Sequence, residues 1–274
     1  MVSFNQNSEN IVWGEMNVAY LKRIPQEARK IGLILLSGGL DSLITAAIAK
    51  KSHNWLLGMF FDYGQRGREI ECQVALNLAR KLDLHSFISA NNAILKTTTE
   101  ITAVPLLNSS RRLPYVKKED LDNIEKLRAT VEAVYIPFRQ VSFYITLAAF
   151  AEAICKSTNV NKVIIYAGGH ATDATTFPDE SVEFTETVKQ LLKSGALYGH
   201  IELDLPLLHQ TKQQAVRRLR ELQIESLIPF SCSCYSPIGI TEEKPIHCGT
   251  CEACMKRKSS LEAARIEDTT IYRG

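Results

Sequence analysis

Short apolar runs alternate along the chain with segments in which apolar residues recur every three or four positions. Apolar runs of about four to eight residues are typical of strands buried on both faces of a parallel sheet. We expect such strands at 33–36, 55–61 and 162–169, and Phe87 and Ile88 mark the start of a further strand. The regular alternation of strands with helices predicts parallel strands joined by right-handed crossovers, which is a doubly wound α/β sheet.

Helical spacing of apolar residues links these strands. In the second helical segment, for example, Val74, Leu78 and Leu82 fall on one face. Such a stripe is typical of a helix that packs against a sheet. The segments with this pattern are 41–50, 68–84, 141–156, 183–192 and 212–222.

Three stretches depart from the alternation. Residues 1–29 precede the first strand, and we expect a short strand or hairpin there, at the edge of the domain. Residues 91–130 are polar and basic, and a long polar loop in a compact domain is usually functional or mobile. A lid over an active site and a merely solvated insertion both fit this loop. Residues 228–262 are rich in cysteine and turn residues, which indicates a separate small unit.

Composition limits the classes of function. The 274 residues are 45% hydrophobic, which suits a globular protein with a sizeable core, and the net charge of +2 gives no strong signal for nucleic acid. No apolar run approaches the roughly 20 residues of a membrane-spanning helix, and no signal-peptide pattern is present. We therefore expect a cytoplasmic protein with no membrane partner. In that compartment the seven cysteines indicate metal binding or chemistry rather than disulfides.

The first strand runs into a glycine turn and then a helix, in the sequence SGGLDS at 37–42. Gly38 and Gly39 allow an anion to approach the backbone, and the start of a helix offers unpaired N–H groups to it. Ser37 and Ser42 add hydroxyl donors. The carboxylate of Asp41 would repel a bound phosphate unless a divalent cation lay between them. A plain strand–helix turn is the alternative interpretation.

The SGGLDS segment resembles the pyrophosphate-binding loop, or PP-loop, of the N-type ATP pyrophosphatases. The resemblance implies the adenine nucleotide alpha hydrolase-like fold, and an enzyme that adenylates a carboxylate or carbonyl and releases pyrophosphate. No Walker A motif occurs, and no G-x-G-x-x-G follows a strand. The resemblance assigns the nucleotide-binding role to Ser37, Gly38, Gly39, Leu40, Asp41 and Ser42, with Asp62 after the second strand.

The C-terminal cysteines have the spacing of a metal site. Two overlapping C-x-x-C units supply Cys248, Cys251 and Cys254, and either Cys232 or Cys234 could complete a tetrahedral zinc site. An iron–sulfur cluster, which also takes thiolates, is the main rival. His247 is a further candidate ligand, and unrelated thiols or a redox switch are the remaining alternatives. A closed four-thiolate site leaves no open position, so the metal is expected to be structural.

Further motifs occur in the order found in the 7-cyano-7-deazaguanine synthase family, which this chain resembles from about residue 32 to residue 257. The motifs are FDYGQR (61–66), IPFRQ (136–140), GGHATDATTFPD (168–179), PLLHQTK (206–212), SCY (233–235) and CGTCEACMKR (248–257). The resemblance implies that 7-carboxy-7-deazaguanine is converted, with ATP, Mg²⁺ and ammonia, to the 7-cyano product, a precursor of queuosine and archaeosine. It also implies that Zn²⁺ is held by Cys234, Cys248, Cys251 and Cys254.

The same resemblance implies roles for residues around the loop. Asp41, Arg139 and Lys212 would be catalytic, with the two cations neutralising phosphate and carboxylate. Asp41 and Asp173 would hold Mg²⁺, although Asp173 is also suited to capping a helix. Lys212 as a solvated charge and Phe177 as a core residue are the plainer alternatives. The expected substrate-binding residues are Gln65, Arg139, Gln140, Asp173, Phe177, Pro178 and Asp179.

The chain departs from the family pattern on the substrate side. Gln140 stands where the family has Asn, Phe177 where it has Tyr, Glu180-Ser181 where it has Cys-Arg, and Gly67 where it has His. A carboxylate at Glu180 would repel an anionic substrate if it faced inward, and would have no consequence if it faced solvent. The ATP loop and the cysteine motif are intact.

We therefore expect an N-terminal extension at 1–29, a PP-loop ATPase domain at 30–227 and a C-terminal zinc-binding element at 228–274. The expected activity is that of a carbon–nitrogen ligase making the 7-cyano product through an adenylate and an amide. One alternative is a divergent enzyme that transfers the adenylated acid to an amine of a protein or nucleic acid. Another is an inactive zinc-stabilised binding module, which the intact SGGLDS loop disfavours. A homodimer is a possible assembly.

Overall fold

A computed structural model of the chain describes residues 11–13, 16–21, 23–102, 104–108, 110–121, 123–170 and 177–273. Within these residues a seven-stranded sheet has the order β1-β2-β5-β4-β3-β6-β7. Its strands are β1 (Ile11–Trp13), β2 (Met16–Leu21), β3 (Lys30–Leu35), β4 (Leu56–Asp62), β5 (Ser86–Asn91), β6 (Lys162–Tyr166) and β7 (His200–Asp204).

The five strands β5, β4, β3, β6 and β7 are parallel to one another, which confirms the predicted doubly wound α/β sheet. The chain builds outward from β3 through β4 to β5, then returns to the other side of β3 to add β6 and β7. The strand order therefore reverses between β3 and β6. In open α/β sheets, ligands bind outside the carboxyl ends of the strands at such a switch point.

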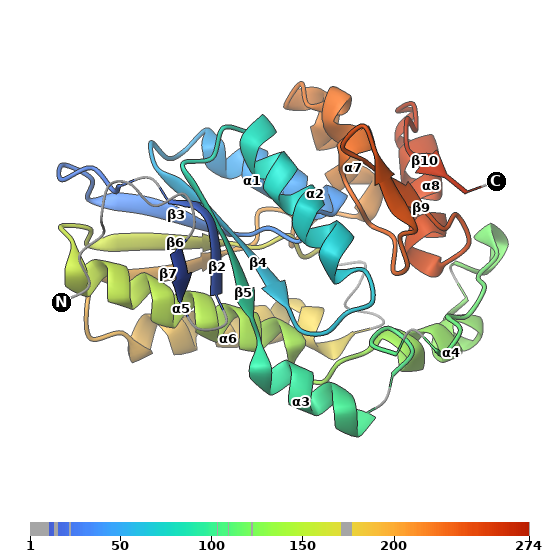
Figure 1. Cartoon of the computed structure of the whole chain (residues 1–274), viewed down its shortest axis with the longest axis horizontal. Helices are drawn as coiled ribbons and strands as arrows, with labels where there is room; N and C mark the ends of the chain where they lie inside the picture. Colours follow the sequence, from blue (N-terminus) through green and yellow to red (C-terminus); the bar gives the residue numbers. More distant parts are fainter. Residues whose placement is uncertain are drawn as a thin grey trace.

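Helices cover both faces of the sheet (Figure 1). One face carries α1 (Leu40–Lys50), α2 (Arg68–Lys81) and α7 (Lys212–Glu221), and the other carries α5 (Arg139–Ser157) and α6 (Val182–Gly195). Side chains of β3 alternate between the two cores, because successive strand residues point to opposite faces. Ile34 and Leu36 pack with α1, whereas Ile31 and Leu33 pack under α5.

A short strand or a hairpin was expected at the domain edge, and the N-terminal segment contributes two antiparallel strands there. Strands β1 and β2 pair antiparallel, and β2 pairs antiparallel with β5. The hairpin thus extends the parallel sheet by two strands on the side away from the switch point.

The prediction of a continuous polar loop over 91–130 was wrong. This region contains α3 (Ala93–Thr102), the 3-10 helix η1 (Lys118–Asp120) and the start of α4 (Ile124–Val134). The segment is mostly polar and basic, but a few of its apolar residues pack into the core. Leu95 and Leu106, for example, are buried under β4 and β5. The segment is also tied to Arg66, whose Nη2 donates to the carbonyl oxygens of Pro105 and Asn108.

The C-terminal segment forms a second, three-stranded sheet with a helix beside it. It comprises the 3-10 helix η4 (Glu225–Phe230), β8 (Gly239–Thr241), β9 (Lys244–His247), α8 (Glu252–Ala264) and β10 (Ile271–Tyr272). Helix α8 packs on α7, as Figure 1 shows. Cys254 and Leu261 of α8 belong to the same hydrophobic cluster as α1 and α2, so the segment is continuous with the core on that face.

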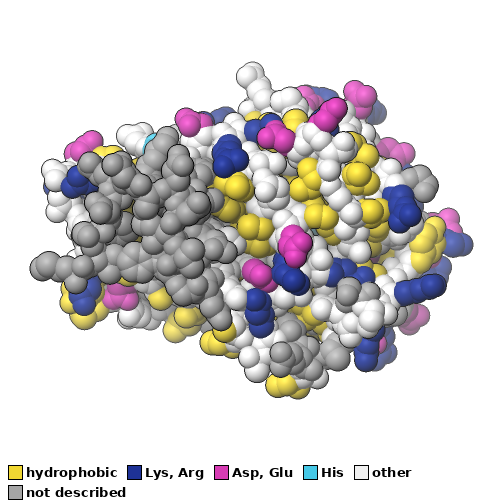
Figure 2. Space-filling view, viewed as in Figure 1, with side chains coloured by type: hydrophobic (Ala, Val, Ile, Leu, Met, Phe, Trp, Pro, Cys, Tyr) yellow, Lys and Arg dark blue, Asp and Glu magenta, His cyan; other side chains and the backbone are white. Residues whose placement is uncertain are grey.

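The surface agrees with the small net charge. On the face seen in Figure 2, Lys and Arg side chains are interspersed with Asp and Glu. Among the described residues, no helix is both long enough and apolar enough to cross a membrane.

Candidate active site and cysteine cluster

A cleft with two lobes opens at the carboxyl ends of β3 and β6, where the fold predicts ligand binding. The inner lobe extends toward α5 and the outer lobe toward the C-terminal segment, and both are lined by Ser37, Gly39, Asp41 and Arg139. The structure thus brings together residues more than a hundred positions apart. The predicted nucleotide and substrate residues that line the cleft are Ser37, Gly39, Leu40, Asp41, Ser42, Gln65, Arg139, Gln140, Phe177 and Lys212.

The SGGLDS loop leaves the first turn of α1 open to a ligand. Gly38 has φ 89°, and a Cβ there would lie 3.0 Å from Val74 Cγ1, so a side chain is excluded by both backbone and space. Ser42 Oγ donates to the carbonyl of Gly39 at 3.0 Å. Among the described residues no side chain caps α1, whose N-cap is Gly39. Its first N–H groups are therefore available to an anion.

Gly168 lets the end of β6 approach the start of α1. A Cβ on Gly168 would lie 2.8 Å from the carbonyl carbon of Asp41 and 2.9 Å from its oxygen. Both are backbone atoms, which cannot move aside as the end of a side chain can. The close approach therefore leaves no room for a side chain at position 168.

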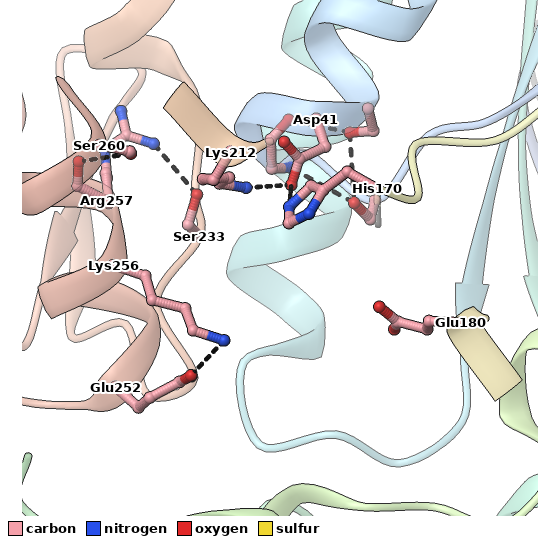
Figure 3. A network of polar contacts seen from close by, with 12 residues as sticks. Asp41, His170, Glu180, Lys212, Ser233, Glu252, Lys256, Arg257 and Ser260 are labelled. Carbon is pink, nitrogen blue, oxygen red and sulfur yellow. Dashed lines mark hydrogen bonds and ion pairs between the residues drawn. The ribbon is translucent and has the colours of Figure 1, made fainter. Parts of the chain in front are cut away.

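Asp41 forms an ion pair with Lys212, and Nε2 of His170 lies 3.9 Å from its Oδ2 (Figure 3). Burial raises the pKa of Asp41, but the nearby Lys212 and His170 more than offset it, so the pKa is lowered overall. Oδ1 of Asp41 is buried and has no hydrogen-bond partner in the described part of the chain. A buried, ionised oxygen of this kind suits a hard divalent cation such as Mg²⁺.

Glu180 faces into the cleft, which answers the question left open by the sequence. Its side chain is 12% exposed, and Arg139 Nη2 lies 3.9 Å from its Oε1. Gln140 Nε2 donates to the same oxygen at 3.0 Å. The two departures from the family pattern at Gln140 and Glu180 therefore contact each other, and Arg139 partly neutralises the added carboxylate.

Other predicted residues are not among those that line the cleft. Asp62 pairs with Lys96 at 3.7 Å and Arg68 at 3.9 Å, and accepts from the Gly64 N–H. Pro178 and Asp179 also do not line the cleft, although their neighbour Phe177 does. Pro178 is exposed, and Asp179 is buried in the 3-10 helix η3 (Pro178–Glu180). Asp173 lies outside the described residues.

Several residues of the cleft were missed by the sequence reasoning. Glu71, in the first turn of α2, lines both lobes, and Gln65 Nε2 donates to its Oε2 at 3.1 Å. Burial raises the pKa of Glu71 to about 7, although Gln65 and Arg139 oppose the shift. Its position early in the helix that follows the FDYGQR motif was the one sequence feature that could have marked Glu71 as a site residue. The sequence reasoning also missed His170, which does not line the cleft but lies beside Asp41, one of its residues.

Arg257 was missed as well, and it builds the wall of the outer lobe. It is 1% exposed, and it donates to the hydroxyls of Ser231, Ser233 and Thr270 and to the carbonyl of Ile228. Figure 3 shows Arg257 beside Ser233, with Lys256 projecting from the same helix toward the cleft. A buried cation with this many acceptors holds the 228–233 segment in place rather than a ligand.

The cysteine cluster has the geometry of a single metal site. The Sγ atoms of Cys234, Cys248, Cys251 and Cys254 all lie within 4.8 Å of one another. The Cys248–Cys254 pair is 3.9 Å apart and the Cys251–Cys234 pair 4.0 Å. Sulfurs at the corners of a tetrahedron around one zinc would be about 3.8 Å apart, from a Zn–S bond of about 2.3 Å. The donors present therefore fit one tetrahedral ion.

Cys232 and His247 lie beside this site without joining it. Burial raises the pKa of Cys232 to about 12, so it remains a thiol. Its backbone N–H donates to the carbonyl of Gly38 at 2.7 Å. Nε2 of His247 lies 3.2 Å from the carbonyl oxygen of Ser231, and burial lowers the pKa of this imidazole to about 4.

The parallel sheet, the open loop at its switch point and the adjoining cysteine cluster define an α/β PP-loop protein. The chain belongs to the QueC family, since the family model described as "Queuosine biosynthesis protein QueC" matches residues 31–265. The 7-cyano-7-deazaguanine synthase of Pyrococcus furiosus is 32% identical over 245 residues, covering 89% of this chain and 97% of the relative. That of Methanocaldococcus jannaschii is 31% identical over 243 residues, covering 88% and 98%.

Two solved structures have a low similarity to the chain. The U34-tRNA thiolase NcsA from Methanococcus maripaludis, with its 4Fe-4S cluster, gives a TM-score of 0.41 at 12% identity and covers 88% of this chain and 72% of its own. A 4-thiouridine synthetase in complex with RNA and ATP gives 0.41 at 14% identity, covering 86% and 50%.

Proposed function

We propose that the protein converts 7-carboxy-7-deazaguanine to 7-cyano-7-deazaguanine in an ATP-dependent reaction with ammonia. The observation that carries the proposal is the group formed by Asp41, Lys212 and His170 at the uncapped start of α1. This group lies in a cleft whose other wall holds Arg139. The family relationship supplies the substrate class.

The nucleotide is expected to bind with its phosphates over the SGGLDS loop. The N–H groups of the first turn of α1 and the ammonium of Lys212 would stabilise their negative charge. Asp41 would hold Mg²⁺ through its buried Oδ1, with Asp173 as a second proposed ligand. When bound, the ion would neutralise phosphate oxygens, whose repulsion otherwise opposes the approach of an anionic nucleophile.

The deazaguanine acid is expected to occupy the inner lobe. Arg139 is suited to a two-point grip on its carboxylate. Gln65 and Gln140 line the inner lobe as hydrogen-bonding groups. Phe177 offers an aromatic face from the adjoining outer lobe, and its ring stacks on Tyr135 with centroids 6.3 Å apart. Pro178 and Asp179 would shape the rest of this binding site.

The proposed chemistry has three stages. The acid's carboxylate attacks the α-phosphorus of ATP, which gives an acyl adenylate and releases pyrophosphate. Ammonia then displaces AMP and leaves the amide. The amide oxygen then attacks the α-phosphorus of a second ATP and releases pyrophosphate. Loss of both nitrogen-bound protons, and departure of that oxygen with AMP, gives the nitrile. Because positioned charges act on the ATP phosphates in both activations, and the attacking oxygen belongs first to the carboxylate and then to the amide at the same carbon, one cleft can serve both.

We further propose that the cysteine cluster holds one structural Zn²⁺. Four thiolates around one point close the coordination sphere and leave no position for substrate. In a multi-iron cluster the thiolates bind different iron atoms, so their sulfurs would lie farther apart than in a site for a single ion. The spacing within 4.8 Å thus favours one ion.

The function is tested with purified protein, 7-carboxy-7-deazaguanine, Mg-ATP and ammonia, followed by mass spectrometry. We expect pyrophosphate exchange into ATP that depends on the acid, then the amide and the nitrile in succession. Absence of acid-dependent exchange would overturn the proposal.

A second candidate function is adenylation of the same acid followed by transfer to a larger amine. The observation that favours it is the inward-facing Glu180, a carboxylate bonded to Gln140 where the resemblance leads us to expect neither residue. In the same experiment, accumulation of adenylate or amide, with transfer only to an added macromolecular amine, would support this candidate. Clean accumulation of the nitrile would exclude it.

A further inference from the structure

Glu71 is an acidic residue of the cleft that the proposed function leaves without a role. Among the described residues, Asp41 and Glu71 are the acidic side chains that line both lobes. Asp41 is engaged by Lys212, whereas no ion pair within 4.0 Å involves Glu71 in the described part of the chain. Glu71 therefore presents a carboxylate where the outer lobe meets the inner lobe, which is the proposed site of the acid.

The position of this carboxylate is fixed from two sides. Helix α2 begins against the SGGLDS loop, since a Cβ on Gly38 would lie 3.3 Å from the Glu71 carbonyl oxygen. Gln65 is 1% exposed, donates from Nε2 to Phe61 O and to Glu71 Oε2, each at 3.1 Å, and accepts from the Tyr63 N–H at 3.0 Å. Because both polar atoms of the Gln65 side chain are engaged, it holds one oxygen of Glu71 in a single direction.

The reaction needs a proton acceptor at this junction. Ammonia is mostly ammonium at neutral pH, and only the free base has the lone pair that attacks an acyl adenylate. A base is most effective when its pKa lies near the working pH. Burial brings the pKa of Glu71 into that range, at about 7. The carboxylate is thus poised to accept a proton near the phosphate loop.

We propose that Glu71 is the general base that takes a proton from ammonium at the amide-forming step. One N–H bond of ammonium breaks, and its proton goes to the Glu71 carboxylate. The freed lone pair forms the C–N bond to the adenylated carbonyl carbon. The C–O bond to AMP breaks, its electron pair leaves with the phosphate, and the second proton lost by nitrogen passes to that phosphate. This role rests on the proposed function.

The groups that face Glu71 are consistent with such a base. Arg139 of α5 favours the carboxylate form, whereas Asp62 at the end of β4 favours the protonated form. The titratable groups of Tyr63, Cys72 and Cys232 are close enough to sense its charge, and burial raises the pKa of each, so they are neutral near pH 7. Of these neighbouring groups, Glu71 is therefore the one expected to gain or lose a proton near neutral pH.

The test compares Glu71→Gln with Glu71→Asp and with Glu69→Gln, an exposed position on the same helix. Each variant is assayed for acid-dependent ATP–pyrophosphate exchange, for amide formation from ammonium, and for hydroxamate formation from hydroxylamine. Hydroxylamine is already unprotonated at neutral pH, so it needs no base to become a nucleophile. Melting temperature is measured for every variant.

We expect Glu71→Gln to retain exchange and hydroxamate formation but to lose amide formation by about 100-fold or more. Its residual amide rate should rise with pH in proportion to free ammonia, whereas the wild-type rate should fall as pH drops through about 7. Glu71→Asp should recover part of the loss, and Glu69→Gln should match wild type.

The role of Glu71 would be overturned if Glu71→Gln lost amide and hydroxamate formation equally, or if it lost no amide formation from ammonium. In either case, acid-dependent exchange in the wild-type protein would still support the proposed function. Loss of exchange in Glu71→Gln would show that Glu71 positions the acid instead, and would also overturn it. If the wild-type protein shows no acid-dependent exchange, the proposed function itself fails and the assignment of Glu71 fails with it.

Discussion

The backbone N–H of Cys232 donates to the carbonyl oxygen of Gly38 at 2.7 Å, which joins the cysteine-rich segment to the SGGLDS loop. Two residues after Cys232, the thiol of Cys234 belongs to the four-sulfur cluster. Arg257, a few residues beyond the last cysteine of the cluster, holds the same segment through Ser231 and Ser233. The cluster and the loop are therefore parts of one structural unit.

This connection predicts that loss of the metal weakens nucleotide binding. Cys251→Ser removes a buried ligand, and because metal binding energy is folding energy, the 232–235 segment should loosen. We expect the Kd for ATP, measured by titration calorimetry, to rise about tenfold or more, an effect of about 1.4 kcal/mol. Cys155→Ser, in the middle of the chain on α5, is the matched control. An unchanged Kd in a metal-free variant would contradict the coupling.

Substitution at Cys232 should have the opposite outcome. Its thiol is outside the cluster and stays protonated, and its contact with Gly38 uses the backbone alone. Cys232→Ser is therefore expected to keep one zinc per chain by elemental analysis and an unchanged affinity for ATP. Cys234→Ser should lose the metal. If Cys234→Ser kept the metal and Cys232→Ser lost it, the fourth ligand would be misassigned.

Gly168 is predicted to tolerate no side chain. A methyl group there would lie within 3 Å of the Asp41 backbone, so Gly168→Ala must push the end of β6 away from α1. We expect a loss of about 1–3 kcal/mol in the free energy of unfolding by urea titration, together with loss of ATP binding. Gly195→Ala is the control, because a Cβ there meets nothing within 4 Å. Equal behaviour of the two variants would refute the close-packing argument.

Much of the fold could be predicted because its signals are local. Runs such as 55–61 encode buried strands by composition, and the spacing of Cys248, Cys251 and Cys254 encodes a metal site within seven residues. Strand β7 was missed because only Ile201 and Leu203 of its five residues are buried, which is too short a pattern to separate from a loop. Helices α3 and α4 were missed because many of their side chains are polar.

The site was less predictable, because its geometry depends on distant contacts. Nothing in the sequence places Glu71 beside Arg139, or gives Arg257 its four hydroxyl and carbonyl acceptors, since the partners come from separate elements. The inward orientation of Glu180 likewise depends on how η3 packs against the start of α5. Sequence motifs identified the loop and the candidate ligands, but tertiary packing decides which of them face the cleft.

Asp41 is expected to matter for activity more than for folding at neutral pH. Asp41→Asn removes the charge that would hold Mg²⁺ and leaves Lys212, which is 22% exposed, to be solvated by water. We therefore expect loss of acid-dependent ATP–pyrophosphate exchange, with a change of about 1 kcal/mol or less in stability at pH 7. Unchanged turnover would show that the loop is only a structural turn.

The same variant gives a prediction for pH. The pKa of Asp41 is lowered in the folded state, so its ion pair stabilises the protein above the unfolded value of about 4. That contribution is lost as pH falls through the lowered folded pKa. Asp41→Asn should accordingly lessen the fall in stability below about pH 4, measured by urea unfolding across pH. If the stability of the two proteins fell equally below about pH 4, the stabilising role of the Asp41 ion pair would be contradicted.

Glu180 is expected to weaken binding of the anionic acid. Its carboxylate lies 3.9 Å from Arg139 and so takes up part of the positive charge that the substrate would use. Glu180→Gln removes the charge but keeps an oxygen that can accept from Gln140. We expect the KM for the acid in ATP–pyrophosphate exchange to fall by about fivefold to tenfold or more, because two like charges about 4 Å apart repel by about 1 kcal/mol even in bulk water. Glu183→Gln, at an exposed position in the first turn of α6, is the control.

A second variant separates charge from shape in this pocket. Gln140→Asn shortens the side chain and should break its 3.0 Å bond to Glu180 without removing the carboxylate, so the KM for the acid should stay the same or rise. In the double variant the fall produced by Glu180→Gln should persist. If Glu180→Gln instead raised the KM, the carboxylate would be orienting Arg139 for the substrate rather than competing with it. The product spectrum of Glu180→Gln, measured with ammonia and with bulkier amines, would then show whether this carboxylate also selects the amine.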